Sequence, residues 1–517
     1  KQGLMGVYAS LKNTDLYGKM FMIDVNSDVA AGYDQYEALQ LGTCTPRTGF
    51  LNGKWQNGYN AIQRANLAIR SIGEAPIDEV PKNQMLGEAR FLRALIYFHL
   101  LDYFGGLPIY DETTDLEKEF NNLLKPRSSA EETRAFILAD LEKALGAGLP
   151  DQWNDANYGR VTLSAAQALL GKVYLYDKQY DKAIENLEKS QAGHALHDDF
   201  AELFTPTGHT SSEMIFSIIN LGGTGNSYGM PLCFYAGTRN SYGSCWNNTV
   251  PSTNLVDMYE YKDGRPFDWD EVFPGFNSDN QVKERVFRCT VNSDGSEVLD
   301  IPAESEKVKV IAPYTTYLGW NRNQERLMTF IFAKNEKGDV VAVNENNGFM
   351  RNNKGGWETY FWRKFVPEGD WNGQITDRAH TPVNFPILRL ADVYLMLAEC
   401  YNETGNQSKA VEYINKVRAR AGIALLNSGP SYLAANTKDE VFQRIFRERA
   451  FELAGEGIRD SDLRRWKLSH TLLNGDEFGI TGKRMLTRVF RENRDYLWPI
   501  PATEIEINPD LTQNPNW

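Results

Sequence analysis

The chain has no excess of basic residues, few cysteines and no long apolar segment. Each of these features argues against a class of protein. Lys and Arg number 55 against 68 Asp and Glu, which gives a formal net charge of −13 over 517 residues. An acidic excess of this size argues against nucleic acid or an anionic membrane surface as the main partner. No run of about 18 apolar residues is present, so we predict no transmembrane helix. The hydrophobic content of 42% is ordinary for a globular protein with a sizeable core.

The five cysteines are scattered and odd in number, so the sequence indicates neither a zinc ribbon nor a disulfide framework. Cys400 falls within a helical pattern and is predicted to be a small buried residue. Cys233 and Cys245 lie close enough in one loop for a local bridge, which the sequence leaves open. His194 and His197 end a predicted helix without a third histidine or an H-E-x-x-H motif, so we predict no metal site and no cofactor.

Residues 162–190 predict a helical hairpin around which the rest of the chain is organised. The sequence TLSAAQALLGKVYLYDKQYDKAIENLEKS places apolar residues at i, i+3, i+4 spacing in two halves, separated by a short polar turn. Small Gly171 and Ala183 would let the two backbones approach, with Tyr174 and Leu187 filling the space beside them. This order of residues is typical of a tetratricopeptide repeat.

The same register returns far downstream, in residues 388–422. At one constant offset, Leu170, Gly171, Tyr174, Ala183 and Leu187 correspond to Leu397, Ala398, Tyr401, Ala410 and Ile414. One hairpin cannot bury its own apolar face, so repeats of this kind stack on one another. We therefore predict a helical solenoid that is interrupted by a long insertion.

Other segments extend this helical pattern. Residues 85–104 are apolar nearly all round, which indicates a buried helix, and a possible capping box at Ser129–Glu132 opens another. EMIFSIIN, at 213–220, has the composition of a strand. Further helices are predicted at 3–11, 55–72, 128–145, 388–401, 408–421 and 438–453.

From about residue 221 to 383 the helical period is lost, and Gly, Asn, Tyr and Trp become frequent. Short strands are predicted at 307–312 and 327–333. A tract of this length inside a helical chain is usually functional. We predict a mainly α single domain over 1–517, in which a scaffold of 1–220 and 384–517 carries a variable, irregular ligand-binding insertion.

Aromatic residues in polar loops are the candidate ligand contacts. Flat rings stack on the apolar faces of sugars, while Asn, Arg and Asp side chains bind the hydroxyls. Three groups stand out, namely Tyr228, Tyr235, Tyr242 and Trp246; Tyr314, Tyr317, Trp320 and Asn321; and Trp357, Trp362 and Trp371. From composition we select as ligand-binding residues Trp246, Tyr242, Tyr235, Trp320, Tyr317, Asn321, Tyr33 and Arg239. For any single ring, ordinary loop anchoring is the alternative.

Signals for catalysis are weak. Residues 225–229 fit G-x-S-x-G, but the following MPLCFYAG is not the helix that a nucleophile elbow requires. No carboxylate pair stands out for glycoside hydrolysis. The charge-dense segment 448–466, ERAFELAGEGIRDSDLRRW, is interpreted as an ion-pair network that ties helix ends together.

Taken together, these segments resemble the SusD/RagB family of outer-membrane nutrient-binding lipoproteins of Bacteroidetes, over essentially the whole chain. The resemblance is carried by YNAIQRANLAI, EARFLRALIYFHLLDYFGGLP, the 162–190 hairpin, LRLADVYLMLAECY, FRERAFELAGEGIRDSDLRRW and the terminal LWPIPATEIEINPDLTQNP. The chain departs from the family at Asn516–Trp517, where Gly and Tyr are more usual.

The resemblance implies tetratricopeptide-like helical pairs that carry a variable insertion, and it implies no catalysis. It implies a cell-surface lid on a TonB-dependent, SusC-like transporter, which captures oligosaccharides or, in some members, peptides. The scaffold would face the transporter, and the insertion with Met20–Phe50 would form the ligand face. Anchoring would use a lipid on an N-terminal Cys; because the chain starts at Lys1 without that Cys or a Met, we expect trimming.

Three alternatives stay open. A peptide- or glycopeptide-binding lid would share this fold. A glycoside hydrolase would need two carboxylates about 5–10 Å apart in the aromatic cleft. A pure protein-interaction scaffold would bury the rings, so the exposure of Trp246 and Trp320 separates it from a binder.

Overall fold

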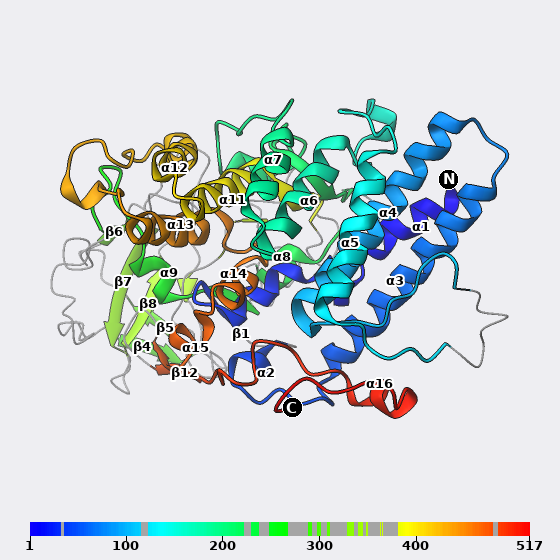
Figure 1. The fold of residues 1–517 in the computed structure, drawn as a ribbon. Coiled ribbons are helices and arrows are strands. Elements are labelled where there is room, and N and C mark those ends of the chain that lie inside the picture. Colours follow the sequence, from blue (N-terminus) through cyan, green and yellow to red (C-terminus); the bar gives the residue numbers. More distant parts are fainter. Residues whose placement is uncertain are drawn as a thin grey trace.

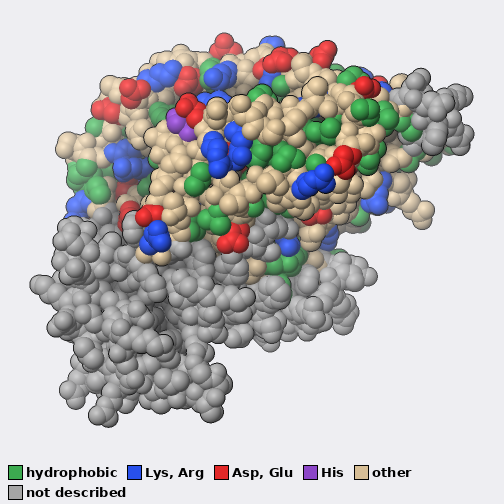
Figure 2. Space-filling view, turned by 90° about the horizontal axis from the view of Figure 1, so that it is seen from below, with side chains coloured by type: hydrophobic (Ala, Val, Ile, Leu, Met, Phe, Trp, Pro, Cys, Tyr) green, Lys and Arg blue, Asp and Glu red, His purple; other side chains and the backbone are tan. Residues whose placement is uncertain are grey.

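The structure is a computed structural model. It describes residues 1–32, 36–114, 123–221, 229–236, 248–266, 288–291, 297–300, 308–310, 328–334, 340–344, 348–349, 362, 364–365, 381–478 and 484–517. No helix among these residues combines the length and apolar content that a bilayer crossing requires. On the face shown in Figure 2, Lys and Arg are interspersed with Asp and Glu.

Antiparallel helices packed in chain order form the scaffold, as Figure 1 shows. They are α1 (Gln2–Ser10), α3 (Gly49–Glu74), α4 (Glu79–Phe104), α5 (Ala130–Leu145), α6 (Leu163–Tyr176), α7 (Tyr180–Lys189), α11 (Leu390–Glu403), α12 (Gln407–Ala421) and α13 (Lys438–Leu453). The predicted helices and the Ser129–Glu132 capping box are confirmed. Helix α4 begins at Glu79, before the predicted start at Met85. Pro81 does not end the helix because it lies in the first turn, where a backbone N–H has no intrahelical partner to lose.

The two tetratricopeptide-like hairpins, far apart in sequence, pack directly on one another. Helix α11 contacts α7, and the Tyr401 hydroxyl of α11 donates a 2.5 Å hydrogen bond to Glu188 of α7. Within the first hairpin, a Cβ atom added to Gly171 would lie 2.6 Å from Cγ of Leu187. The predicted close approach of the two backbones is therefore confirmed.

A two-stranded sheet closes the scaffold at the insertion. Strand β2 (Met214–Ile218), predicted from EMIFSIIN, pairs antiparallel with β10 (Phe385–Arg389), and Ile218 lies opposite Phe385. The insertion therefore leaves and returns at the same end of this sheet. Its described strands include β6 (Val308–Val310) and β7 (Met328–Lys334), as predicted, in a sheet of order β6-β7-β8-β9.

The remaining elements are short. They are β1 (Ala30–Gly32), α2 (Glu37–Gln40), α8 (Leu232–Ala236), β3 (Thr249–Pro251), α9 (Thr253–Asp257), β4 (Arg288–Val291), β5 (Glu297–Asp300), β8 (Val340–Asn344), β9 (Gly348–Phe349), α14 (Arg459–Arg465), α15 (Ser469–Leu472), β11 (Gly475–Phe478), β12 (Arg484–Arg488) and α16 (Ala502–Ile507).

The ion-pair network of residues 448–466 is confirmed, but it lies in the core rather than on the surface. Arg389 of β10 donates hydrogen bonds to Glu452, Glu456 and Glu213 at 2.5–2.9 Å, and these side chains are all buried. Arg449 bridges Asp392 and Asp462 elsewhere in the network. Buried charges require such partners because desolvation is otherwise unfavourable.

Residues 20–32 also pack inward, although we expected Met20–Phe50 to face the ligand. The buried Asp24 carboxylate accepts hydrogen bonds from the backbone amides of Gly455, Gly457 and Arg459. At Gly457, where φ is +75°, a Cβ would lie 2.3 Å from the Met20 carbonyl oxygen. This part of the segment is a buried partner of the C-terminal helices, which corrects the expectation for 20–32.

Candidate ligand-binding site

A short antiparallel ribbon of β1 and β3 brings two candidate segments together. Gly32 of β1 lies opposite Thr249 of β3. Gly32 is the last described residue of the first segment, and Asn248 is the first described residue of the second. The pairing places both at the same end of the ribbon. That end adjoins the segments in which Tyr33 and Trp246 were predicted as ligand contacts. We call it the ribbon end.

Buried polar contacts fix the ribbon to the scaffold. Arg488 donates from Nη2 to the Ala30 carbonyl of β1 at 2.6 Å and from Nη1 to the Val25 carbonyl, before β1, at 2.7 Å. The Gln40 amide donates to the Gly32 carbonyl at 2.9 Å. A buried guanidinium that satisfies two carbonyls holds the backbone in one position. The ribbon is therefore held against the scaffold by side chains from outside it.

Trp362 lies against this ribbon from the inside. Its ring is 4% exposed, and its indole N–H lies 3.4 Å from the Thr249 hydroxyl oxygen. A Cβ on Gly455 would approach the ring to 3.3 Å, so the indole also packs closely on the C-terminal part of the scaffold. Trp362 was grouped with loop rings available for stacking; the structure makes it a core residue.

Tyr235, in α8, is the selected ligand residue that the structure describes. Its ring is half-buried, with the Phe234 ring edge-on at 5.0 Å and the Lys19 ammonium 4.4 Å from the ring centroid. Its carbonyl accepts a 2.6 Å hydrogen bond from the Asn248 amide, which places it beside the ribbon end. Trp246, Tyr242, Trp320, Tyr317, Asn321, Tyr33 and Arg239 lie outside the described residues.

The contact of Lys19 with Tyr235 was not predicted. Lys19 follows the first helix by several residues, and no periodicity or motif in the sequence pairs it with α8. An ammonium over an aromatic face contributes about 0.5–1 kcal/mol at an exposed site. Only the tertiary structure brings these two segments together.

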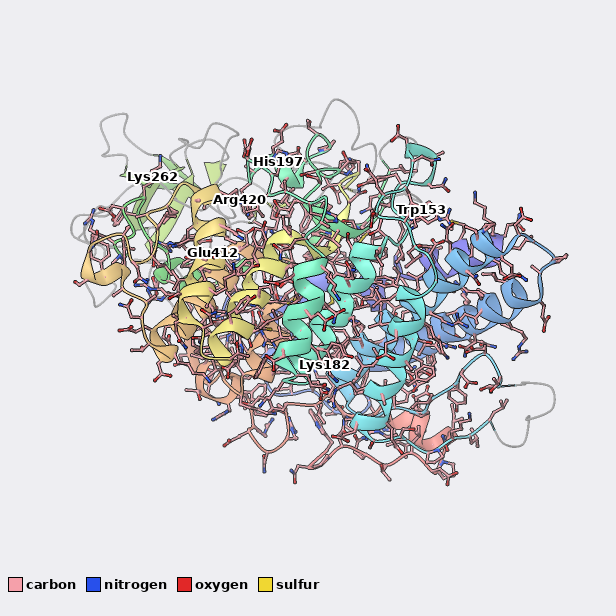
Figure 3. The ribbon with its side chains drawn as sticks, turned by 45° about the horizontal axis from the view of Figure 1, so that its top comes forward. Trp153, Lys182, His197, Lys262, Glu412 and Arg420 are labelled. Atoms are coloured by element: carbon pink, nitrogen blue, oxygen red, sulfur yellow. The ribbon has the colours of Figure 1, made fainter. Side chains whose placement is uncertain are left out.

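The other motifs make local contacts or fall outside the described chain. The His194 ring nitrogen lies 2.7 Å from the Ser212 carbonyl, and the His197 ring accepts from the Asp199 amide at 3.3 Å. Figure 3 shows His197 near Arg420, which donates to the His197 carbonyl at 3.4 Å. Within the described ranges no three His, Cys, Asp or Glu side chains are grouped to hold a metal.

Three further predictions concern the 225–229 motif and the cysteines. Most of 225–229 lies beyond the described residues, as do the Cys245 backbone and the Cys233 side chain, so the local bridge stays a prediction. Cys400 is a buried free thiol, as predicted, and so is Cys44. Burial raises the pKa of the Cys44 thiol to about 11, which keeps it unreactive.

Comparisons with known families decide the relationship. A model described as "SusD family" matches residues 212–517, which is more than half of the chain. The chain belongs to the SusD family. A second model, described as "Starch-binding associating with outer membrane", matches residues 1–175.

Sequence relatives of this SusD-family protein extend over most of its length. A SusD-like protein of Formosa agariphila is 27% identical over 531 residues, covering 98% of this chain and 90% of the relative. The starch-binding protein SusD of Bacteroides thetaiotaomicron is 23% identical over 449 residues, covering 83% of this chain and 72% of that protein.

Solved structures have the same fold. A SusD-like carbohydrate-binding protein of Bacteroides fragilis matches with a TM-score of 0.74 and 24% identity, covering 99% of this chain and 98% of that one. Surface glycan-binding protein A of Bacteroides thetaiotaomicron, in complex with laminarihexaose, matches with a TM-score of 0.68 and 18% identity, covering 99% and 98%. The predicted mainly α, tetratricopeptide-like SusD fold is confirmed.

Proposed function

We propose that this SusD-family protein is a non-catalytic cell-surface protein that captures oligosaccharides and delivers them to a TonB-dependent, SusC-like transporter. The observation that carries the proposal is the SusD family match; the likeness of the fold to a surface glycan-binding protein in complex with laminarihexaose supports it. The description of the model matching residues 1–175 supports starch-like ligands and a position at the outer membrane. Attachment there is through an N-terminal lipid, and nucleic acid is not a partner.

The ligand face, in this proposal, is built around the ribbon end. Tyr235 lies there, and the segments containing Tyr33 and Trp246 adjoin it. We assign further ligand contacts to Trp320, Tyr317 and Asn321 of the insertion. Each stacked ring contributes about 1 kcal/mol, so a few rings give micromolar to millimolar affinity. Affinity in that range suits capture followed by release.

Isothermal titration against a panel of plant, microbial and host glycans tests the proposal. We expect one class of saccharide to bind, and Trp246→Ala, Trp320→Ala or Tyr235→Ala to weaken that binding. Trp153→Ala is the matched control: Trp153 stacks on Arg160, at 3.8 Å, outside the insertion, and Figure 3 shows it far from Lys262. Binding that survives all three ring substitutions would place the site elsewhere.

Two outcomes would replace this function. Release of new reducing ends during incubation would indicate a glycoside hydrolase. Binding of peptides in place of every glycan would indicate the peptide-binding alternative. Delivery is tested separately, because a SusC-like transporter from the same cell should co-purify with the lipidated protein, and its failure to do so would contradict the lid.

A further inference from the structure

We propose a second binding site, for a neutral sugar unit, in a pocket on the helical scaffold between α3 and the loop that follows α4. The pocket has a volume of about 570 Å³, which is within the range of small-ligand sites. Figure 1 shows α3 at the end of the molecule opposite strands β4–β8. None of the residues that line the pocket belongs to β1, β3 or α8, so it is distinct from the ribbon end. The proposal rests on the proposed function and extends it, because both sites take the same class of ligand.

Residues 110–114, which follow α4, form one wall of the pocket. Asn66 of α3 donates to the Tyr110 carbonyl at 3.0 Å, and its own carbonyl oxygen accepts from buried Arg93 at 2.6 Å. Arg70 donates to the carbonyls of Glu112 and Thr114 at 2.7–3.0 Å. These contacts hold residues 110–114 in place without a ligand, so binding against this wall carries a smaller entropic cost.

The apolar part of the pocket consists of aromatic and aliphatic side chains. The Tyr59 and Tyr110 rings are 5.9 Å apart and nearly perpendicular, and Leu67 beside them is 47% exposed. Both phenol groups already donate to carbonyls, of Pro108 and Leu123, so these rings offer apolar surface rather than free hydroxyls. Ring faces beside hydrogen-bonding groups suit the mixed surface of a sugar.

An unsatisfied hydroxyl indicates what the pocket binds. Thr114 lines the pocket and is 8% exposed, yet its Oγ1 has no hydrogen-bond partner among the described residues. A buried polar group left unpaired destabilises a protein by about 1–3 kcal/mol. A ligand hydroxyl in the pocket would satisfy it. On the α3 side, Gln63 lines the pocket with an exposed amide that provides a further donor and acceptor.

The charges in the pocket disfavour an anionic ligand. Burial opposes ionisation of Asp111, but hydrogen bonds from Thr113 and the charge of Arg93 outweigh it, so the pKa of Asp111 is lowered. The ionised carboxylate repels anions and accepts hydrogen bonds from hydroxyls. Arg70 is the cation that lines the pocket, and its Nε and Nη2 donate to backbone carbonyls. A neutral, hydroxyl-rich ligand matches this arrangement better than a phosphate or a carboxylate.

Titration with laminarihexaose and maltohexaose tests the pocket in the full chain carrying Trp246→Ala, Trp320→Ala and Tyr235→Ala, which removes the three rings that test the ribbon-end site. In this background we expect residual binding of one probe. Thr114→Val and Gln63→Ala should each weaken that binding roughly two- to tenfold, the loss expected for one hydrogen bond. Asn60→Ala, an exposed amide on α3 that does not line the pocket, is the matched control and should have no effect.

The outcomes separate the two sites. If the background protein binds neither probe while the parent binds, the pocket proposal is overturned and the ribbon-end site stands. If neither Thr114→Val nor Gln63→Ala changes the affinity of the residual binding, the pocket proposal is also overturned. The pocket is supported if Thr114→Val and Gln63→Ala weaken binding of the probe while Asn60→Ala does not. The unfolding temperature of Thr114→Val should then be no lower than that of the parent. Binding by neither protein contradicts both sites for these sugars.

Discussion

Arg459 holds Asp28 through two parallel hydrogen bonds, of 2.7 Å from Nε and 2.8 Å from Nη2, although 431 residues separate them in the chain. Both residues are buried, at 2% and 5% exposure. The Asp28 carbonyl also accepts a 2.5 Å hydrogen bond from Ser252, directly after β3. One ion pair thus connects helix α14, the segment before β1 and the ribbon that supports the proposed ligand face.

Loss of Arg459 should therefore destabilise the whole fold. Arg459→Met leaves Asp28 buried and unpaired, which should cost about 3–5 kcal/mol of the free energy of unfolding, measured by urea denaturation. Adding Asp28→Asn removes the unpaired buried carboxylate and should restore part of the lost free energy of unfolding. Arg47→Ala is the control, because its pair with Glu506 is 71% and 57% exposed and should be worth at most about 1 kcal/mol. Equal effects of Arg459→Met and Arg47→Ala would contradict this prediction.

The buried network should make the protein sensitive to acid. Burial opposes ionisation of Glu452, but Arg420 and Arg389 lower its pKa to about 2. Burial likewise opposes ionisation of Asp392, but Lys172 and Arg449 lower its pKa. Both folded-state pKa values lie below the unfolded ones, near 4, so this stability is present above about pH 5 and is lost as the pH falls toward 2. Burial raises the pKa of Glu448 to about 7, which acts in the opposite sense, so the test is a contrast: urea midpoints measured from pH 6 to 3 should fall more steeply in the parent than in Glu452→Gln.

The ionisation of the buried Lys54 should affect the free energy of unfolding above pH 7. Lys54 Nζ lies 2.9 Å from His99 Nε2, and burial lowers the pKa of Lys54 to about 7. Between pH 7 and about 10 the unfolded chain binds the extra proton, so stability rises with pH by at most about 1.4 kcal/mol per unit. Lys54→Met should flatten the rise in urea midpoint between pH 7 and 9. An unchanged slope would mean that Lys54 is charged in the folded protein.

The close approach in the first hairpin should be intolerant of one added methyl group. Gly171→Ala places a Cβ 2.6 Å from Leu187 Cγ and 3.1 Å from its backbone nitrogen, so we expect a loss of about 1–3 kcal/mol. Gly73→Ala is the matched control in helix α3: nothing lies within 4 Å of its added Cβ, and the helix should gain about 0.5 kcal/mol. Thermal unfolding of both variants measures the contrast, and a Gly171→Ala protein as stable as the parent would argue against tight packing.

Helix periodicity and capping allowed much of the scaffold to be predicted, because those signals are local. The 438–453 helix was predicted at its observed bounds, and the repeated tetratricopeptide register identified both hairpins. The candidate site was less predictable. Aromatic composition selected Tyr235, but it did not separate that half-buried ring from Trp362, which is core. Composition records that a ring is present, whereas burial depends on what packs against it.

Local signals in the sequence are therefore sufficient to predict the helical pairs, their repeat and the family to which they belong. The tertiary structure decided which charges are buried and which distant segments meet. Arg459 belongs to the segment predicted to form an ion-pair network, but nothing in the sequence identified Asp28 as its buried partner. Helix propensity and amphipathic spacing act within a few residues along the chain. The partner of a buried charge instead depends on which distant segments the chain topology brings together.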